Sequence, residues 1–248
     1  MTIDPSRRTI LRRLTFVAAS AVVGSQVLSL PAHAAGKDIN RNDLREEIRR
    51  AQERNKRVQS GVPSNNGWEM EKVADDHGSI YSRPVPGVLL DGVQMRMGEI
   101  ETILVYVISR FHYEIDPLRK GDVVGWREPG SVRKGLAESN LASGTAVRIR
   151  PGSYPFGARG GFYPMEALVV RDILAECEGV VRWGGDDRKP DESLFYIDVP
   201  PGDERLIRTA QKIRAWNYKP GKGSGVLLDP LQPQRRKAAE VLAARQAQ

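Results

Sequence analysis

The residue types that support metal or nucleophilic chemistry are scarce in this chain. There is one cysteine, Cys177, and there are three histidines, at positions 33, 77 and 112. A single cysteine excludes an internal disulfide and a thiolate-rich zinc module. Cys177 closes an apolar helical pattern, so we expect a buried structural thiol rather than a nucleophile. This scarcity limits any mechanism that needs a metal.

Other candidate metal donors are present but scattered. They are His77, His112, Asp186, Asp187 and Asp191. Carboxylates are common in loops, and scattered histidines are usually structural or on the surface. The sequence therefore favours structural or surface roles for these five residues over a relocated metal site. The glycine-rich segments 157–161 and 221–225 lack the Lys-Ser/Thr ending of a P-loop, so phosphate binding is not indicated. Ser139 has no histidine near it in the sequence that would make it a nucleophile.

The elements that must position these residues follow from hydrophobic periodicity. Residues 98–112, 163–178 and 203–216 carry apolar side chains at helical spacing and predict three helices. Strand patterns occur at residues 79–83, 121–126, 144–149, 180–183 and 194–199. Helices interleaved with short strands and short links predict an α+β fold with a small, mainly antiparallel sheet packed with helices.

Three sequence blocks follow one another within this region. Residues 139–148 read SNLASGTAVR, residues 181–187 read VRWGGDD, and residues 191–195 read DESLF. In order and spacing they resemble the S-x-H-x-x-G-x-A-x-D, W-G-G-D and D/E-x-x-H-F blocks of the zinc D-alanyl-D-alanine carboxypeptidases and L-alanyl-D-glutamate endopeptidases. The resemblance covers about residues 98–199. It implies the hedgehog/D,D-peptidase fold for a domain at residues 68–218.

The same resemblance implies that the zinc site has been lost. In the family, zinc is held by the His and Asp of the first block and the His of the last, and this chain has Leu141, Arg148 and Leu194 there. A catalytic zinc needs about three imidazole, carboxylate or thiolate ligands. Asp191 stands at the family's catalytic carboxylate position, but a carboxylate without metal-activated water is a poor peptidase. We therefore expect no catalytic residue and no cofactor, with zinc bound only if its ligands are relocated.

The vacated cleft retains residues that could bind a ligand. The candidates are Ser139, Arg148, Arg150, Trp183, Asp186, Asp187 and Asp191. Strand alternation predicts that Arg148 and Arg150 share one face, and the resemblance directs that face toward the cleft. We expect Arg148 to form a hydrogen-bonded pair with one of the three aspartates. The alternative is that Arg148 or Arg150 keeps a free guanidinium for a ligand carboxylate.

The first 34 residues have the plan of an export signal. Paired arginines at positions 7 and 8 precede a weakly apolar run over residues 14–30, and a small-x-small cleavage site follows at residues 32–34. The arginine pair resembles a twin-arginine signal; a Sec signal and a membrane anchor are the alternatives. The run is short for a transmembrane helix. We expect export across the cytoplasmic membrane to an extracellular, periplasmic or wall-associated location, with no membrane attachment after cleavage.

Signal removal also changes the charge of the chain. It takes away four arginines and one aspartate, so the formal net charge falls from +7 to +4. A charge of this size does not indicate nucleic-acid binding.

Further segments flank the expected domain. Residues 36–60 predict a charged helix, either a solvated spacer or a pairing or wall-contacting helix. Residues 61–67 predict a linker. Residues 219–248 form a Gly- and Pro-rich basic tail that ends in a short helix or a disordered end.

Three functions are compatible with these observations. The leading hypothesis is an exported, catalytically inactive D,D-peptidase-like protein that binds cell-envelope material, either peptidoglycan peptides or a partner protein. The second is an active peptidoglycan peptidase with non-standard metal ligands. The third is an envelope scaffolding protein that acts through the charged helix and the basic tail.

Overall fold

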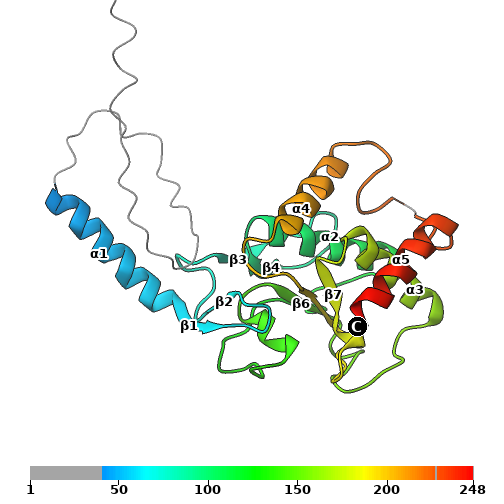
Figure 1. Ribbon diagram of the computed structural model, residues 1–248, viewed down its shortest axis with the longest axis horizontal. Helices are drawn as coiled ribbons and strands as arrows, with labels where there is room; N and C mark the ends of the chain where they lie inside the picture. The colour runs from blue at the N-terminus through cyan, green and yellow to red at the C-terminus, as the bar shows by residue number, and fades with distance from the viewer. Residues whose placement is uncertain (1–40, 227, 248) are drawn as a thin grey trace, which may run out of the picture. The chain divides into compact units, whose positions relative to one another are not determined.

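Five α-helices lie in residues 41–226 and 228–247, which the computed structural model describes (Figure 1). They are α1 (Arg41–Val58), α2 (Glu99–Glu114), α3 (Pro164–Glu176), α4 (Glu204–Asn217) and α5 (Pro233–Gln246). The expected export signal, residues 1–34, lies outside the described residues and stays a prediction. Within them, every helix is too short or too polar to cross a membrane.

The strands form one central sheet and two ribbons. The sheet is antiparallel in the order β5-β6-β8-β7, with β5 (Val123–Val124), β6 (Ala146–Ile149), β8 (Leu194–Ile197) and β7 (Val181–Trp183). The antiparallel ribbons pair β1 (Gln59–Pro63) with β2 (Glu69–Glu71), and β3 (Ile80–Arg83) with β4 (Val93–Arg96). Helices combined with small antiparallel sheets confirm the predicted α+β class.

The central sheet has two differently packed faces. Val147 of β6 and Phe195 of β8 pair across the ladder and belong to the main core, which α2 and α3 also line. Ala146 and Leu194, which point the other way, pack in a second apolar cluster with Leu141. Side chains alternate across a strand, so the two clusters lie on opposite faces of the sheet. On this second side lie Leu141, Arg148 and Leu194, the positions that the resemblance matches to zinc ligands.

The helices on the core side are tied together by a buried arginine. The Arg110 side chain of α2 is fully buried and donates a hydrogen bond to Asp172 at 2.8 Å, with further hydrogen bonds to Glu114 and Glu176. Arg235 of α5 reaches both Asp172 and Glu176. A buried charge is tolerated only when it is paired in this way. The network holds α2, α3 and α5 together, and α5 lies beside α3 (Figure 1).

Two of the segments that flank the expected domain, residues 61–67 and 219–248, pack against it. The predicted helix at residues 36–60 is observed as α1 over its described part, but the linker expected at residues 61–67 is not a linker. Part of it lies in β1, and the side-chain amide of Asn66 then donates to Thr145 Oγ1 at 2.9 Å and to the Ile197 carbonyl at 2.7 Å. The Gly/Asn composition reflects a tight turn whose polar groups are paired, not a flexible spacer.

The C-terminal tail is likewise packed rather than free. The short helix expected within residues 219–248 is present as α5, which begins with Pro233. Ala239 is buried, and Leu242 packs against the main core. Because Arg235 also joins the buried network around Arg110, the helix contributes to the domain itself.

Candidate functional site

The first and last sequence blocks meet on the second face of the central sheet. Leu141 ends the short 3-10 helix Ala137–Leu141 and packs in the same apolar cluster as Leu194 of β8. Arg148 of β6 is the register partner of Leu194. The three positions that would carry zinc ligands by resemblance therefore lie together. Both leucines are fully buried and offer no lone pair.

Arg148 is the centre of a hydrogen-bonded network at this place. Its Nε and Nη2 atoms donate to Asp191 Oδ2 at 2.9 and 2.7 Å, and Nη2 also donates to Glu138 Oε1 at 3.1 Å. The other Asp191 oxygen accepts a hydrogen bond from Ser193 Oγ at 2.6 Å, and Arg133 pairs with Glu138. The expected pairing of Arg148 with an aspartate is confirmed, and the partner is Asp191. Two arginines and two carboxylates make the network electrically neutral.

The surroundings of Glu138 keep it ionised. Burial acts to raise the pKa of this carboxyl, but the hydrogen bond from Arg133 and the charge of Arg148 outweigh burial. The pKa of Glu138 therefore lies below its usual value. Glu138 is thus a fixed negative partner for the guanidinium of Arg148 at neutral pH.

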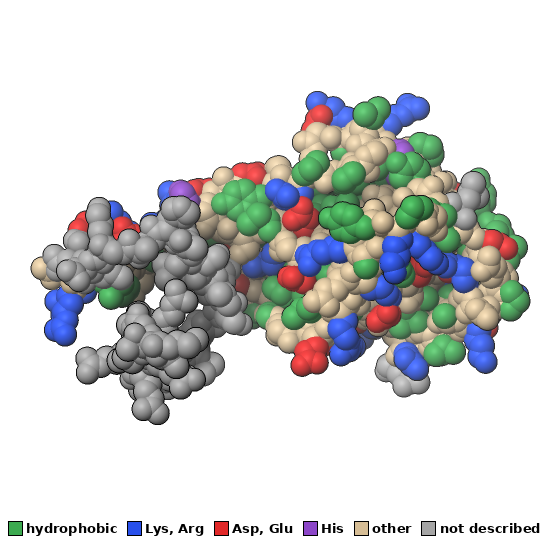
Figure 2. All heavy atoms as spheres, turned by 90° about the horizontal axis from the view of Figure 1, so that it is seen from above, with side chains coloured by type: hydrophobic (Ala, Val, Ile, Leu, Met, Phe, Trp, Pro, Cys, Tyr) green, Lys and Arg blue, Asp and Glu red, His purple; other side chains and the backbone are tan. Residues whose placement is uncertain are grey.

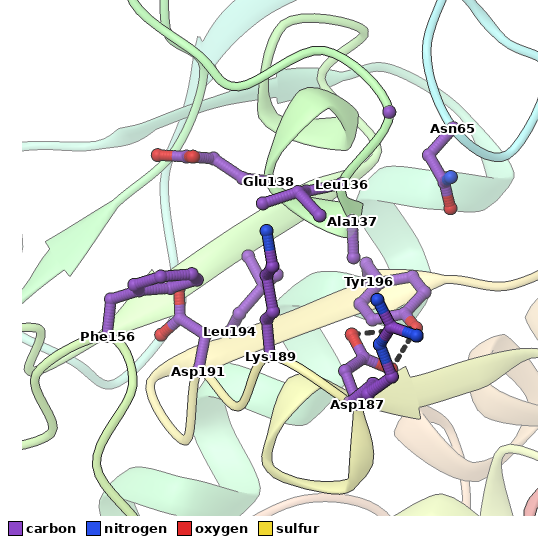
Figure 3. Close-up of a pocket in the computed structure, with 12 residues that line it drawn as sticks. Asn65, Leu136, Ala137, Glu138, Phe156, Asp187, Lys189, Asp191, Leu194 and Tyr196 are labelled. Atoms are coloured by element: carbon purple, nitrogen blue, oxygen red, sulfur yellow. Dashed lines mark hydrogen bonds between the residues drawn. The ribbon is translucent and has the colours of Figure 1, made fainter.

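A pocket of about 290 Å³ opens beside this network (Figure 3). Glu138, Asp191 and Leu194 line it next to Arg148, while Phe156 contributes an aromatic surface. The other lining residues are Asn65, Gly135, Leu136, Ala137, Asp187, Arg188, Lys189 and Tyr196. The pocket thus combines apolar surface with both signs of charge, as small-molecule sites usually do.

One side of the pocket is a rigid loop at residues 184–190. The guanidinium of Arg159 donates to the carbonyl oxygens of Gly185 at 3.1 Å and Asp187 at 2.9 Å. At the end of the loop, the Asp191 amide donates to the Gly184 carbonyl at 2.9 Å. These bonds fix the backbone that presents Asp187, Arg188 and Lys189 to the pocket. A fixed backbone lowers the ordering cost of binding a ligand.

Like Asp191, the predicted loop aspartate Asp187 lines the pocket. Its carboxylate accepts a hydrogen bond from Tyr196 Oη at 3.0 Å, and Arg182 Nε lies 3.5 Å away. Burial raises the pKa of Asp187, although the hydrogen bond from Tyr196 and the charge of Arg182 act against burial. Tyr196 and Arg182 come from β8 and β7, so the sheet itself holds Asp187 in place.

Two predicted binding residues lie elsewhere. Strand β6 ends at Ile149, and Arg150 has φ 52°, so the alternation that would place it beside Arg148 is broken. Arg150 pairs with Asp116 instead, away from the pocket lining. The prediction that the two arginines share a face was therefore wrong. Asp186 pairs with Arg171 of α3 and does not line the pocket either.

Ser139 and Trp183 have structural roles. Ser139 Oγ donates to the Leu136 carbonyl at 2.8 Å and accepts from the Asn65 amide at 2.9 Å, so the hydroxyl is engaged within the protein. Trp183 is buried in the main core and donates from Nε1 to the Glu192 carbonyl at 2.7 Å. A side chain on Gly185 would collide with the Trp183 ring, which explains the glycine two residues after this tryptophan.

The scattered metal donors remain scattered in the structure. The side chain of His77 is exposed, and His112 Nδ1 accepts a hydrogen bond from the Leu118 amide at 2.8 Å. In the described part of the chain, no three His, Cys, Asp or Glu residues are grouped so that they could hold a metal ion. Cys177 is buried as expected, and burial raises its pKa to about 12, so the thiol stays protonated.

Charge over the surface is mixed. On the face that Figure 2 presents, Lys and Arg side chains are interspersed with acidic and hydrophobic ones. No protein-family model, curated protein or solved structure matches this chain. Its function therefore has to be inferred from the chemistry of the pocket and the Arg148 network.

The sequence had not indicated several residues that shape the pocket. Glu138, Phe156 and Tyr196 carry no motif of their own and are brought in by the fold. Arg188 and Lys189 form a short basic pair in a loop, a pattern that is usually a solvated surface and so gave no signal. The W-G-G-D resemblance indicated the aspartates of this loop and not Arg188 and Lys189, which also line the pocket.

Proposed function

We propose that this chain is an exported protein with a hedgehog/D,D-peptidase-like domain that binds peptidoglycan stem peptides and does not hydrolyse them. The pocket beside Arg148 is the binding site in this proposal. In this proposal the domain still recognises the peptide but lacks the zinc that would hydrolyse it.

The observation that carries the proposal is the pair between Arg148 and Asp191. Arg148 and Asp191 come from the first and last blocks of the resemblance, and Leu141 and Leu194 lie beside them. A dication 4 Å from a guanidinium would be repelled by up to about 8 kcal/mol at an effective dielectric near 20. The carboxylate that would act in catalysis is instead neutralised by an arginine. The convergence of the three substituted positions supports the resemblance, and their side chains support loss of the zinc.

The pocket itself supports binding. It lies next to the substituted positions, and Phe156 and Leu136 offer apolar surface beside the charged groups. Its volume of about 290 Å³ is near the lower end for ligand sites, which suits the end of a peptide rather than a folded partner. A protein that binds such an end without cleaving it would recognise or shield uncrosslinked wall peptides.

The proposal is tested with the mature protein and synthetic stem peptides. Binding is measured by calorimetry, and the same mixtures are followed by mass spectrometry for released amino acids. We expect saturable binding with no cleavage, and no change when a chelator is added. Cleavage that the chelator abolishes would show an active metallopeptidase. Absence of binding to any stem peptide would contradict the proposed function.

A filled pocket provides the control. Ala137 lines the pocket and packs at the edge of the second apolar cluster, so the side chain of Ala137→Trp should fill the pocket and block binding. Thermal unfolding of this variant checks that the domain is still folded. Unchanged binding by a folded Ala137→Trp protein would place the peptide outside this pocket.

A further inference from the structure

We infer that Lys189 is the anchor for the free C-terminal carboxylate of the bound peptide, an inference that rests on the proposed function. The ligand is then a peptide whose last residue is small and whose terminus is not amidated.

Every carboxylate that lines the pocket already has a partner. Asp191 and Glu138 accept hydrogen bonds from Arg148, and Glu138 also pairs with Arg133. Asp187 pairs with Arg182, which also lies 3.9 Å from Asp198 outside the pocket. These arginines neutralise the acidic groups of the lining, so they contribute little net attraction for an anion.

Arg188 and Lys189 are the cations that remain. Across residues 41–226 and 228–247, neither side chain has a hydrogen bond or an ion pair, and both are exposed. Lining cations without a protein counter-charge leave the pocket with an excess of positive charge. Such an excess favours an anionic ligand.

Lys189 is the better placed of the two. Figure 3 shows its side chain extending into the pocket, with Phe156 on one side and Asp187 and Tyr196 on the other. The backbone on either side of Lys189 is held by hydrogen bonds at Asp187 and Pro190. An ammonium is a compact charge that hydrogen-bonds a carboxylate directly.

Arg148 is less suited to this role, because it is not among the residues that line the pocket. Its Nε and Nη2 atoms are already committed to Asp191 and Glu138, so the Nε–Nη2 edge cannot form a two-pronged contact with a ligand carboxylate. The alternative drawn from the sequence, a free guanidinium at Arg148 or Arg150, is therefore replaced by the ammonium of Lys189. The apolar surfaces of Leu136 and Leu194 leave room for a small side chain next to the carboxylate.

The test compares one stem peptide in two forms, with a free and with an amidated C-terminus. Both are titrated into the wild-type protein, Lys189→Gln, Lys189→Arg and Lys219→Gln. Lys219 is a matched control because it is an exposed lysine outside the pocket lining. We expect amidation and Lys189→Gln each to weaken binding about tenfold, the size of one charge-assisted hydrogen bond.

The losses of binding free energy caused by amidation and by Lys189→Gln should not be additive. Amidation should cost the Lys189→Gln protein almost nothing, because the partner of the carboxylate is already gone. Lys189→Arg should keep most of the affinity, and Lys219→Gln should behave as wild type. Equal affinity of the wild type for both peptides would overturn this inference and leave the proposed function standing. An amidation effect that persists in Lys189→Gln would also overturn it, and failure of both peptides to bind would contradict the two proposals together.

Discussion

Arg148 and Asp191 are joined by two hydrogen bonds that end on the same carboxylate oxygen, at 2.9 and 2.7 Å. The two residues are far apart in the sequence, and each comes from a block that the resemblance associates with zinc. The Asp191 side chain is 4% exposed and that of Arg148 is 18% exposed. A pair this deep stabilises the fold only while both partners are present, because either charge alone is stranded away from water.

Replacing Arg148 should therefore be costly. We expect Arg148→Met to lower the free energy of unfolding by about 3 kcal/mol, since Asp191 would lose its counter-charge in a buried place. Arg150→Met is the matched control: Arg150 pairs with Asp116, but both side chains are about a third exposed, and exposed pairs contribute about 0.5 kcal/mol. Urea unfolding of the two variants measures the difference.

Removing both charges should recover part of the loss. The double variant Arg148→Met, Asp191→Leu leaves no stranded partner, so we expect it to be more stable than Arg148→Met alone. Equal losses for Arg148→Met and Arg150→Met would show that the Arg148 pair is not an important contact of the fold.

Glu138 should make stability depend on pH in the acidic range. Its folded-state pKa lies below the usual value of 4.5, so its carboxylate stabilises the fold at pH values above the unfolded pKa. This contribution is lost as the pH falls through the folded-state value. We expect Glu138→Gln to cost about 1–2 kcal/mol at pH 7 and progressively less below about pH 4.5.

The measurement is urea unfolding of wild type and Glu138→Gln from pH 7 to pH 3. Glu204→Gln is the control, because Glu204 is highly exposed and lies 3.7 Å from Arg208 on the same helix. A difference between wild type and Glu138→Gln that grows as the pH falls would contradict the assigned direction of the pKa shift.

The turn that had been predicted as a linker should contribute to stability. Asn66 donates two hydrogen bonds from one side-chain amide, whereas the Asn65 side chain points to the pocket (Figure 3). We expect Asn66→Ala to cost about 1–3 kcal/mol, because buried acceptors on Thr145 and Ile197 lose their donor. Asn65→Ala should change the unfolding free energy by less than about 0.5 kcal/mol. Similar, small changes in the unfolding free energy of Asn66→Ala and Asn65→Ala would favour a flexible linker at residues 61–67.

Much of the fold was predictable because its helices and strands have regular apolar spacing. The helix predicted at 98–112 is α2, that at 163–178 is α3, and that at 203–216 is α4, each within two residues at its ends. The apolar spacing is visible in the sequence because one face of each helix is buried against the core. The strand predicted at 144–149 is β6, although its first residues belong to the preceding turn.

The parts that were not predictable depend on contacts between distant residues. Arg110 lies in an apolar helical stripe and gives no local sign that it is fully buried with three carboxylates. The left-handed conformation of Arg150 also has no local signal, since non-glycine residues adopt it only a few per cent of the time. The same holds for the pocket, where Lys189 becomes distinctive only once every neighbouring carboxylate is found to have another partner.

The central claim is that an arginine–carboxylate pair stands where the resembled enzymes hold zinc. The zinc content of the purified mature protein, measured by elemental mass spectrometry after dialysis, tests this claim most directly. We expect less than about a tenth of an equivalent in the wild type. Leu141→His, Arg148→Asp and Leu194→His, combined in one folded variant, should raise it to about one. Stoichiometric zinc in the wild type that is lost in Asp191→Asn would contradict the account.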